Sequence, residues 1–588
     1  MAQESGSATP EAGEQSSLLG EQRNIKVDDA SSETLTGSQG ADEEELVDPD
    51  RANQQVGRGR GMLIVLSLWG LIFLQAANMS GITTTQSKIA EDLDAFAAAS
   101  WFTSAYLIAA SSISPLSARL AQVFSPRVCV LVSSVFFALG GLIASQAQDL
   151  TGFLAGRAVQ GLGGAGIMTI SFILVLELAG KKRRGLYIGL VNTGFTIGVS
   201  FGAVVAGALL PVTGWRFLFW IQCPLALAFG TGIFFSIPKH FTSGQKDDGA
   251  SIMRKLARID YLGALMLIAT ISLFLFGLSS QHVLWIPIVV SFVLLIFFVC
   301  IELYIASDPI IPISVLKSRG ALLSCVAQLG IMAARWSVLF YTPAYAIAIR
   351  GWSPASAGSI LLPTNFGFAI GGILAGGLHI KRSGSFWLPS IVSYSLFACA
   401  LALISQISNQ DTPTLLYFLA VFVNGLCIGS ALNYTLAHLL HLTPPSTHFI
   451  STSLLTTFRG FAGSFGSAIG GGLFVRVLKA KLEQGFEEHG DLEGNEDLIR
   501  RLLGSPALVK ELVGFEKQIA IDSYVGGLKA LFVAGVGLAV LMVVVQAFTG
   551  WKEPVEVKGE NEANGNEVEN GLLGVEDEEW EEGMEQGV

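Results

Sequence analysis

Charged side chains are scarce in this sequence. Asp, Glu, Lys and Arg make up 14% of its 588 residues, against roughly 25% in ordinary soluble domains. The mean hydropathy is correspondingly high, at +0.55. This composition excludes a single water-soluble fold.

Patterns typical of catalytic and metal centres are also missing. The six cysteines stand singly in apolar segments, with no CxxC pair and no histidine at metal-ligand spacing, which favours buried apolar roles. The sequence has no HExxH or GxxxxGK[ST] motif and no dinucleotide fingerprint in a strand–turn–helix setting. We therefore expect a protein that is not an enzyme, holds no metal or cofactor and is not driven directly by ATP.

Negative charge is concentrated at the two ends of the chain. Residues 1–50 and residues 549–588 each hold 13 acidic and 2 basic side chains, which leaves a net charge of +11 on residues 51–548. Both tails are rich in Glu, Ser, Gly, Gln and Asn, a composition typical of disorder, and nucleic acid is an unfavourable partner for them. Within the first tail, Glu14 followed by Leu18 and Leu19 resembles a di-leucine sorting signal read by an adaptor, although such patterns also arise by chance.

Apolar stretches long enough to cross a bilayer as helices recur through the body of the chain. Fourteen are predicted, at residues 62–84, 99–121, 128–147, 152–177, 185–210, 215–237, 261–280, 283–305, 320–347, 354–379, 386–405, 413–436, 447–475 and 524–548. With a cytosolic N-terminus, the inner loops hold 15 basic residues and the first six outer loops hold 3. Because basic residues accumulate on the cytosolic side, this asymmetry predicts that both tails are cytosolic.

The outer segment 476–523 does not follow that charge rule. It holds 7 basic and 10 acidic residues with helix-like periodicity. Long loops obey the rule poorly. We expect a short amphipathic element over the outer mouth, acting as a structural cap rather than as a ligand-binding lid.

No Asp or Glu falls at mid-membrane depth, and the deep charges are all positive. They are Arg157, Arg335 and Arg459. An arginine inside a spanning helix is costly unless it is paired or faces a wet cavity, so each is a functional candidate. A cavity lined by these three would attract anionic or carbonyl-rich ligands and repel cations. Further candidates at this depth are Asn78, Gln160, Trp336 and Asn424; other polar residues there, including Gln75, Gln222 and Asn365, more often form helix–helix hydrogen bonds.

Several motifs carry a family resemblance. Residues 156–164 read GRAVQGLGG, and residues 214–216 read GWR. The first resembles the fourth-helix motif of the major facilitator superfamily, with Gly161 at its second glycine, and the second resembles the start of that family's sixth helix. Four further glycines resemble the antiporter motif of exporters: Gly194, Gly198, Gly202 and Gly207.

The resemblance extends over about residues 62–548 and is strongest with fungal fourteen-helix drug:proton antiporters and related vacuolar amino-acid transporters. It implies an all-α integral membrane protein with the major facilitator fold. Two six-helix bundles (62–237 and 319–548) are expected, with two additional helices in 238–318 and acidic tails at 1–61 and 549–588. Independently of the family, the glycines at i, i+4 predict a smooth helical stripe that serves as tight packing or as a sliding surface.

The sequence departs from the family pattern at residues that bear on mechanism. Asn78 stands where a titratable aspartate is usual, and an amide cannot take up a proton. The loop after the second helix keeps Arg119 and Arg127 but has Gln122 in place of an aspartate, and Val199 replaces the proline of the antiporter motif.

The sequence therefore predicts a secondary transporter that exports small organic molecules by alternating access, with lipid and a small-molecule substrate as partners and protons as candidate coupling ions. Two alternatives remain open at this point. One is a vacuolar amino-acid transporter, which the di-leucine pattern favours. The other is a non-transporting membrane sensor, which the loss of aspartate at positions 78 and 122 favours.

Overall fold

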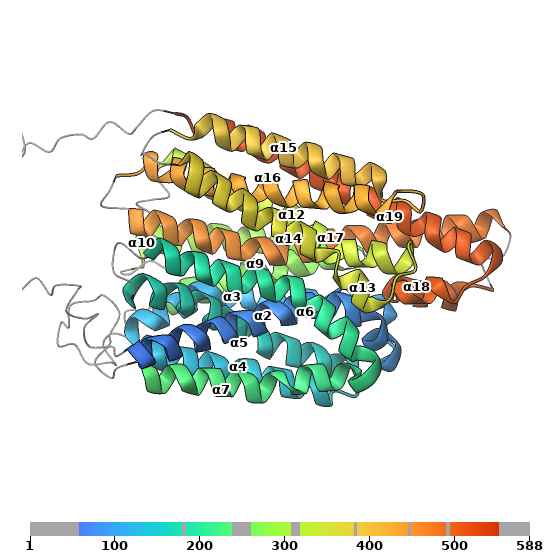
Figure 1. Cartoon of the computed structure of the whole chain (residues 1–588), viewed down its shortest axis with the longest axis horizontal. Helices are drawn as coiled ribbons and strands as arrows, with labels where there is room; N and C mark the ends of the chain where they lie inside the picture. The colour runs from blue at the N-terminus through green and yellow to red at the C-terminus, as the bar shows by residue number, and fades with distance from the viewer. Residues whose placement is uncertain are drawn as a thin grey trace, which may run out of the picture. The chain divides into compact units, whose positions relative to one another are not determined.

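The computed structural model describes residues 58–178, 184–237, 260–280, 282–306, 318–380, 385–444, 448–489 and 494–551. All of these residues lie in one compact unit, Pro49–Val588. Every regular element within them is helical, and the long helices run side by side (Figure 1). The sorting-signal candidates Glu14, Leu18 and Leu19 lie outside the described residues.

The first part of the chain forms six long helices and one short turn of 3₁₀-helix. They are α2 (Arg58–Asp92), η1 (Phe96–Ala98), α3 (Trp101–Val123), α4 (Pro126–Gln146), α5 (Leu150–Leu178), α6 (Arg184–Trp220) and α7 (Gln222–Ser236). These helices pack chiefly on one another, α4 on α5, α2 on α6 and α3 on α5.

Two further helices follow, α9 (Tyr261–Ser279) and α10 (Trp285–Tyr304), and α9 packs against α3 and α17. The remaining elements are α12 (Arg319–Ala348), α13 (Pro354–Gly358), α14 (Leu361–Ile373), η2 (Leu374–His379), α15 (Trp387–Ile407), α16 (Thr414–His441), α17 (His448–Glu488), α18 (Glu496–Gly504), η4 (Pro506–Lys510) and α19 (Gly514–Ala547). Their main contacts are α14 on α16, α15 on α16 and α19, and α12 on α17 and α19.

The described helices account for all fourteen predicted spans. Thirteen are long and apolar enough to cross a bilayer, and Gln222–Ser236 is a shorter apolar helix. The sixth predicted span starts within α6, because Gly214 has a φ of +74° and breaks the helix just before Trp215. A positive φ is readily adopted only by glycine. The predicted all-helical fold with about fourteen spans is therefore confirmed.

The faces that lie outside the packed helices are apolar. Helix α10 exposes Ile286, Phe292 and Ile296 to more than half of their full area. A water-facing helix would carry polar residues there, so these side chains face lipid hydrocarbon.

The segment after the thirteenth span is more helical than predicted. Helix α17 continues from the predicted end at residue 475 to Glu488, and the amphipathic element in the outer segment is α18, which buries Ile499 and Leu502. In Figure 1, α18 lies with the ends of α17 and α19 at one extremity of the bundle.

Candidate functional site

A cavity of about 1280 Å³ lies among α2, α3, α5, α6, α12, α14, α16 and α17. Its wall is mainly apolar and aromatic and includes Phe172, Phe195 and Trp336. Arg459 is the single charged side chain among the described residues that line it. Pockets of this size and character bind small organic molecules.

The cavity reaches one end of the bundle. Ala118 and Ile173 line it near the last turns of α3 and α5, and Gly376 lines it within η2. In the charge-based topology these helix ends lie on the cytosolic side.

At the opposite end the helices close on one another. A Cβ at Gly207 of α6 would lie 2.6 Å from the backbone nitrogen of Ala355 in α13, and a Cβ at Gly358 would lie 2.7 Å from the carbonyl carbon of Ala203. The Oγ atoms of Ser104 in α3 and Ser467 in α17 are 3.2 Å apart. Small residues thus permit backbone-to-backbone packing that seals this end.

Arg157 anchors a buried polar network behind the cavity wall. Its side chain is fully buried and donates three hydrogen bonds, to the carbonyl of Phe102 (2.9 Å), to Oδ1 of Asn78 (2.6 Å) and to Oε1 of Gln160 (2.9 Å). The guanidinium also lies over the Tyr106 ring, 4.7 Å from its centroid. A buried guanidinium held by hydrogen bonds and an aromatic face is stabilised without a carboxylate.

Gln222 at the start of α7 completes this network. Its Oε1 accepts hydrogen bonds from Asn78 Nδ2 (2.7 Å) and Gln160 Nε2 (3.0 Å), and its Nε2 donates to the carbonyl of Leu218 (2.8 Å). Asn78, Arg157, Gln160 and Gln222 therefore link α2, α5 and α7. The sequence predicts Gln222 as a polar residue within a membrane span. Its spacing from Arg157 gives no indication that the two belong to one hydrogen-bond network.

Two further arginines lie on the opposite side of the cavity. Arg335 in α12 is 3% exposed, donates to Asn365 Oδ1 of α14 at 2.8 Å and stacks over Phe368 at 4.5 Å. Arg459 in α17 lies at the cavity surface. The next residue after Arg335, Trp336, lines the cavity and stacks on Phe340.

The structure thus separates the seven candidate cavity residues into two groups. Trp336 and Arg459 line the cavity. The other five are buried outside its described lining: Asn78, Arg157, Gln160, Arg335 and Asn424. The expected lining by three guanidiniums therefore differs from the geometry, which places Arg459 at the wall and Arg157 and Arg335 behind it. Asn424 is fully buried in α16, and neither its Oδ1 nor its Nδ2 has a hydrogen-bond partner among the described residues.

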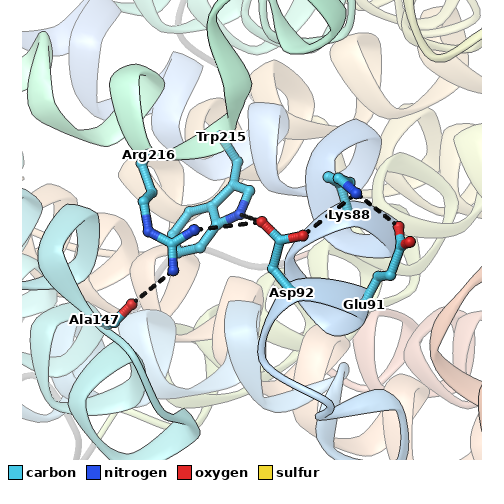
Figure 2. Close-up of polar contacts among 6 residues, drawn as sticks. All are labelled: Lys88, Glu91, Asp92, Ala147, Trp215 and Arg216. Carbon is cyan, nitrogen blue, oxygen red and sulfur yellow. Dashed lines mark hydrogen bonds and ion pairs between the residues drawn. The ribbon is translucent and has the colours of Figure 1, made fainter.

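An acidic residue outside the predicted set organises the closed end (Figure 2). Asp92 Oδ2, at the end of α2, accepts hydrogen bonds from Trp215 Nε1 (2.8 Å) and Arg216 Nη1 (3.3 Å), and Asp92 Oδ1 pairs with Lys88 (3.3 Å). Arg216 also donates to the carbonyl of Ala147 at 3.0 Å. Trp215 and Arg216 of the GWR sequence are therefore the partners of Asp92. Their hydrogen bonds link α2 and the α4–α5 connection to the segment that follows the kink at Gly214.

The outer segment contacts the first helices at the same end. Arg500 of α18 pairs with Asp94, with 2.9 Å between Nη2 and Oδ1, and lies over the Phe96 ring. Hydrogen bonds to Asp94 and Asp497 raise the pKa of Arg500. Gly504 packs directly on the backbone of Phe96. The predicted cap thus spans from the last helices to the α2–α3 connection.

Comparison with known families identifies the chain. Residues 68–467 match the family model described as the Major Facilitator Superfamily. The chain belongs to the Major Facilitator Superfamily. The family resemblance drawn from the motifs is therefore confirmed, and the protein is an integral membrane transporter rather than an enzyme.

The relatives of this transporter include fungal efflux proteins. It is 25% identical over 78% of its length to the multidrug resistance protein fnx1 of Schizosaccharomyces pombe, of which 87% is covered. It is 26% identical to the vacuolar membrane amino acid uptake transporter fnx2 of the same organism, over 78% of this chain and 79% of that protein. It is also 26% identical to the efflux pump FUS6 of Gibberella moniliformis, over 74% of this chain and 78% of that protein. These matches support the predicted fungal drug-efflux branch.

Solved structures show the same fold. The chain aligns with a bacterial homologue of the human lysosomal transporter Spinster in an inward-facing, unoccupied conformation, with a TM-score of 0.57, 12% identity and coverage of 84% of this chain and 97% of that one. It also aligns with the peptide transporter POT at a TM-score of 0.56 and 13% identity, covering 86% and 99% of the two chains.

The motif residues of this superfamily member fall at helix contacts. Gly161 packs on the backbone of Tyr106, and Gly194, Gly198 and Gly202 face α2, where a Cβ on Gly198 would lie 2.6 Å from that of Ala76. Arg127 lies over the Phe234 ring at 5.1 Å. Arg119 is half-buried near the end of α3. The Gln122 side chain lies outside the described part of the structure.

Proposed function

We propose that this transporter exports small organic molecules by alternating access, and that the structure corresponds to a cytosol-open state. The proposal is supported chiefly by the apolar, aromatic-walled cavity. This cavity reaches the helix ends assigned to the cytosol, and close helix packing closes it at the other end. In this proposal residues 62–237 and 319–548 act as the two bundles that rock about the cavity. The fungal efflux relatives support export as the direction.

We further propose that any proton coupling does not run through position 78. Asn78 cannot bind a proton and already uses both ends of its amide, toward Arg157 and Gln222. No Asp or Glu is found among the described residues that line the cavity. Counterflow in proteoliposomes, with and without an imposed pH gradient, tests the coupling. We expect transport to continue without the gradient.

The transport proposal is tested with purified protein. A thermal-shift screen of drug-like compounds, aromatic metabolites and amino acids identifies ligands, because a molecule that binds the native state raises its melting temperature. Stabilising compounds are then radiolabelled and their efflux from proteoliposomes is measured. We expect efflux faster than that from protein-free liposomes. In Arg157→Ala protein that still elutes as a monodisperse peak, and is therefore folded, we expect efflux to be strongly reduced. If ligands bind but leave proteoliposomes no faster than protein-free liposomes, the transport proposal is overturned and the sensor alternative is favoured.

A second candidate is movement of amino acids across the vacuolar membrane. The similarity to fnx2 and the Glu14, Leu18, Leu19 pattern favour it. The positive charge of Arg459 at the cavity disfavours basic amino acids as substrates. Amino-acid hits in the thermal-shift screen would support this candidate. Loss of vacuolar targeting in a Leu18→Ala, Leu19→Ala fluorescent fusion would assign the sorting signal.

A further inference from the structure

Three large apolar side chains line the cavity and are nevertheless highly exposed. Phe201 of α6 is 48% exposed, and Phe366 and Ile373 of α14 are 65% and 67% exposed. Their exposure is comparable with that of Phe292, on the lipid-facing side of α10. Phe201 lies near the middle of α6, and Phe366 lies near the middle of the span Pro354–His379. These two residues are therefore exposed at the depth of the bilayer hydrocarbon and not at the membrane surface.

Contact with the cavity alone does not account for this exposure. Trp336 borders the same space and is only 6% exposed, and Phe172 and Phe195 are half-buried. A large side chain that faces only the cavity is thus mostly covered by its neighbours. The additional exposed area of Phe201 and Phe366 therefore lies toward the outside of the bundle, and the cavity wall is open to hydrocarbon between α6 and α14.

The other exposed residues of the described lining follow the same two helices. Four of the five lie on α6, α14 or η2, and the fifth is a glycine of α17: Thr193, Ala369, Gly376, Gly377 and Gly460. Toward the outer end, the opening is limited by the close packing of Gly358 in α13 against Ala203 in α6. The opening therefore extends from mid-membrane depth toward the helix ends that the charge-based topology assigns to the cytosol.

The opposite side of the cavity, between α3 and α17, is closed. Ser111 Oγ of α3 donates a hydrogen bond to Ser464 Oγ of α17 at 2.8 Å. Helix α9 packs against both helices, and the Oγ atoms of Ser272 in α9 and Ser112 in α3 are 3.2 Å apart. The described lining residues of α3 are all buried or half-buried. Helix α9 thus separates this side from lipid, and the lateral opening is confined to the side of α6 and α14.

We propose that the cavity takes up its ligand from the hydrocarbon of the cytosolic leaflet, through the opening between α6 and α14, and that it binds lipophilic molecules dissolved in the bilayer. Such molecules concentrate in the membrane because the transfer of apolar surface out of water is favourable. The apolar rim of Phe201, Phe366 and Ile373 lets them pass into the aromatic-walled cavity without crossing water. This inference rests on the proposed transport function, and it specifies the substrate class and the route of entry.

A photoreactive lipid tests the opening directly. The probe is a phosphatidylcholine with an aryl diazirine at the end of one acyl chain, in nanodiscs that hold the purified full-length protein. Because the diazirine is tethered to a lipid, it reaches the cavity only from the bilayer. After illumination, labelled residues are identified by mass spectrometry. The interior label is defined as the label on Met332 and Trp336, two buried residues that line the cavity.

We expect the interior label to exceed the label on Leu401 at least about tenfold, because Leu401 is fully buried outside the described lining and close packing excludes the probe from it. Label on the lipid-facing Phe292 measures general reaction with lipid. An interior label no stronger than that on Leu401 would overturn the inference.

A larger side chain in the opening assigns the route of entry. Ala369 lines the cavity, is exposed and lies between Phe366 and Ile373 on the same face of α14. Ala369→Trp should fill the opening and lower the interior label at least about fivefold, because an acyl chain cannot pass through a filled space. The label on Phe292 should stay unchanged.

A second variant and a matched control complete the test. Ile373→Trp narrows the same opening nearer the cytosol and replaces Ala369→Trp if that protein does not elute as a monodisperse peak. Ala228→Trp changes an exposed alanine of α7 outside the described lining and should keep the wild-type interior label. An interior label that persists in the folded α14 variants would overturn the route. Because labelling requires no transport, interior label without efflux of any ligand would contradict only the proposed transport function. Efflux without interior label would contradict only the lateral opening.

Discussion

Asn78 illustrates how one side chain can replace the carboxylate usual at its position without leaving Arg157 unsupported. Its Oδ1 accepts from Arg157 as an aspartate would, and its Nδ2 donates to Gln222, which an aspartate cannot do. The amide therefore satisfies two partners in a network that has no carboxylate among its described members. The asparagine cannot take up a proton, and both ends of its amide are used in hydrogen bonds.

We predict that Asn78→Ala destabilises the protein by about 1–2 kcal/mol, because it removes an acceptor from a buried guanidinium and a donor from Gln222. Asn78→Asp keeps the acceptor and provides a negative charge for Arg157, so its melting temperature should stay closer to that of the wild type. Thermal unfolding in one detergent measures both variants. If alanine is tolerated as well as aspartate, the Arg157 network does not depend on position 78.

For single residues, the sequence predicts how deep a side chain lies in the membrane but not whether it faces the cavity. The three arginines were recognised because a charge inside an apolar stretch is conspicuous at any rotation of the helix. Whether each faces the cavity depends on the rotation and packing of its helix, so Arg459 at the wall and Arg335 behind it could not be distinguished. Asp92 was missed for a related reason, since an acidic residue at a helix end has the pattern of a solvated terminus until Trp215 folds against it.

Among the elements, α6 combines two kinds of glycine contact. Gly194, Gly198 and Gly202 bring it against α2, its main partner, whereas Gly207 meets α13 from the other part of the bundle. The first three contacts hold within one group of helices. The Gly207 contact joins α6 to a helix that would move relative to it in alternating access.

We predict different outcomes for leucine at the two kinds of site. Gly202→Leu forces a side chain into the backbone of Ala77 and should cost about 1–3 kcal/mol or prevent folding. Gly207→Leu should keep a melting temperature near that of the wild type but slow transport, because closure against Pro354 and Ala355 is blocked. Melting temperature and proteoliposome efflux are measured on both. Equal destabilisation by the two substitutions would show that the α6–α13 contact is a fixed part of the fold.

Helix positions were predictable because about 20 apolar residues are needed to cross the hydrocarbon, and this requirement leaves a clear pattern in the sequence. The prediction was poorer where helices leave the membrane. Helix α17 runs on to Glu488 through polar residues, and the sixth span begins at a glycine kink inside α6. Hydropathy does not register either feature, because both depend on backbone geometry and on packing outside the bilayer.

For the molecule as a whole, the outer contact between α18 and the α2–α3 connection must break if the closed end is to open. It has a polar and a steric component. The Arg500–Asp94 pair joins side chains that are 43% and 71% exposed, and exposed ion pairs contribute little to stability. Gly504, in contrast, lies against the backbone of Phe96, with 2.7 Å between a Cβ placed on Gly504 and the carbonyl carbon of Phe96. Close packing at Gly504 should therefore dominate over the ion pair.

We predict that Gly504→Val opens the closed end far more than Arg500→Gln does, because a valine cannot fit against Phe96. Ser104→Cys reports on opening, since Ser104 is fully buried at its contact with Ser467. In detergent, we expect maleimide labelling of this cysteine to accelerate about tenfold with Gly504→Val. Arg500→Gln should accelerate labelling far less, because an exposed ion pair contributes little to stability. Protein without Ser104→Cys gives the background from the native cysteines. A larger effect of Arg500→Gln than of Gly504→Val would mean that charge, and not close packing, keeps this end of the transporter closed.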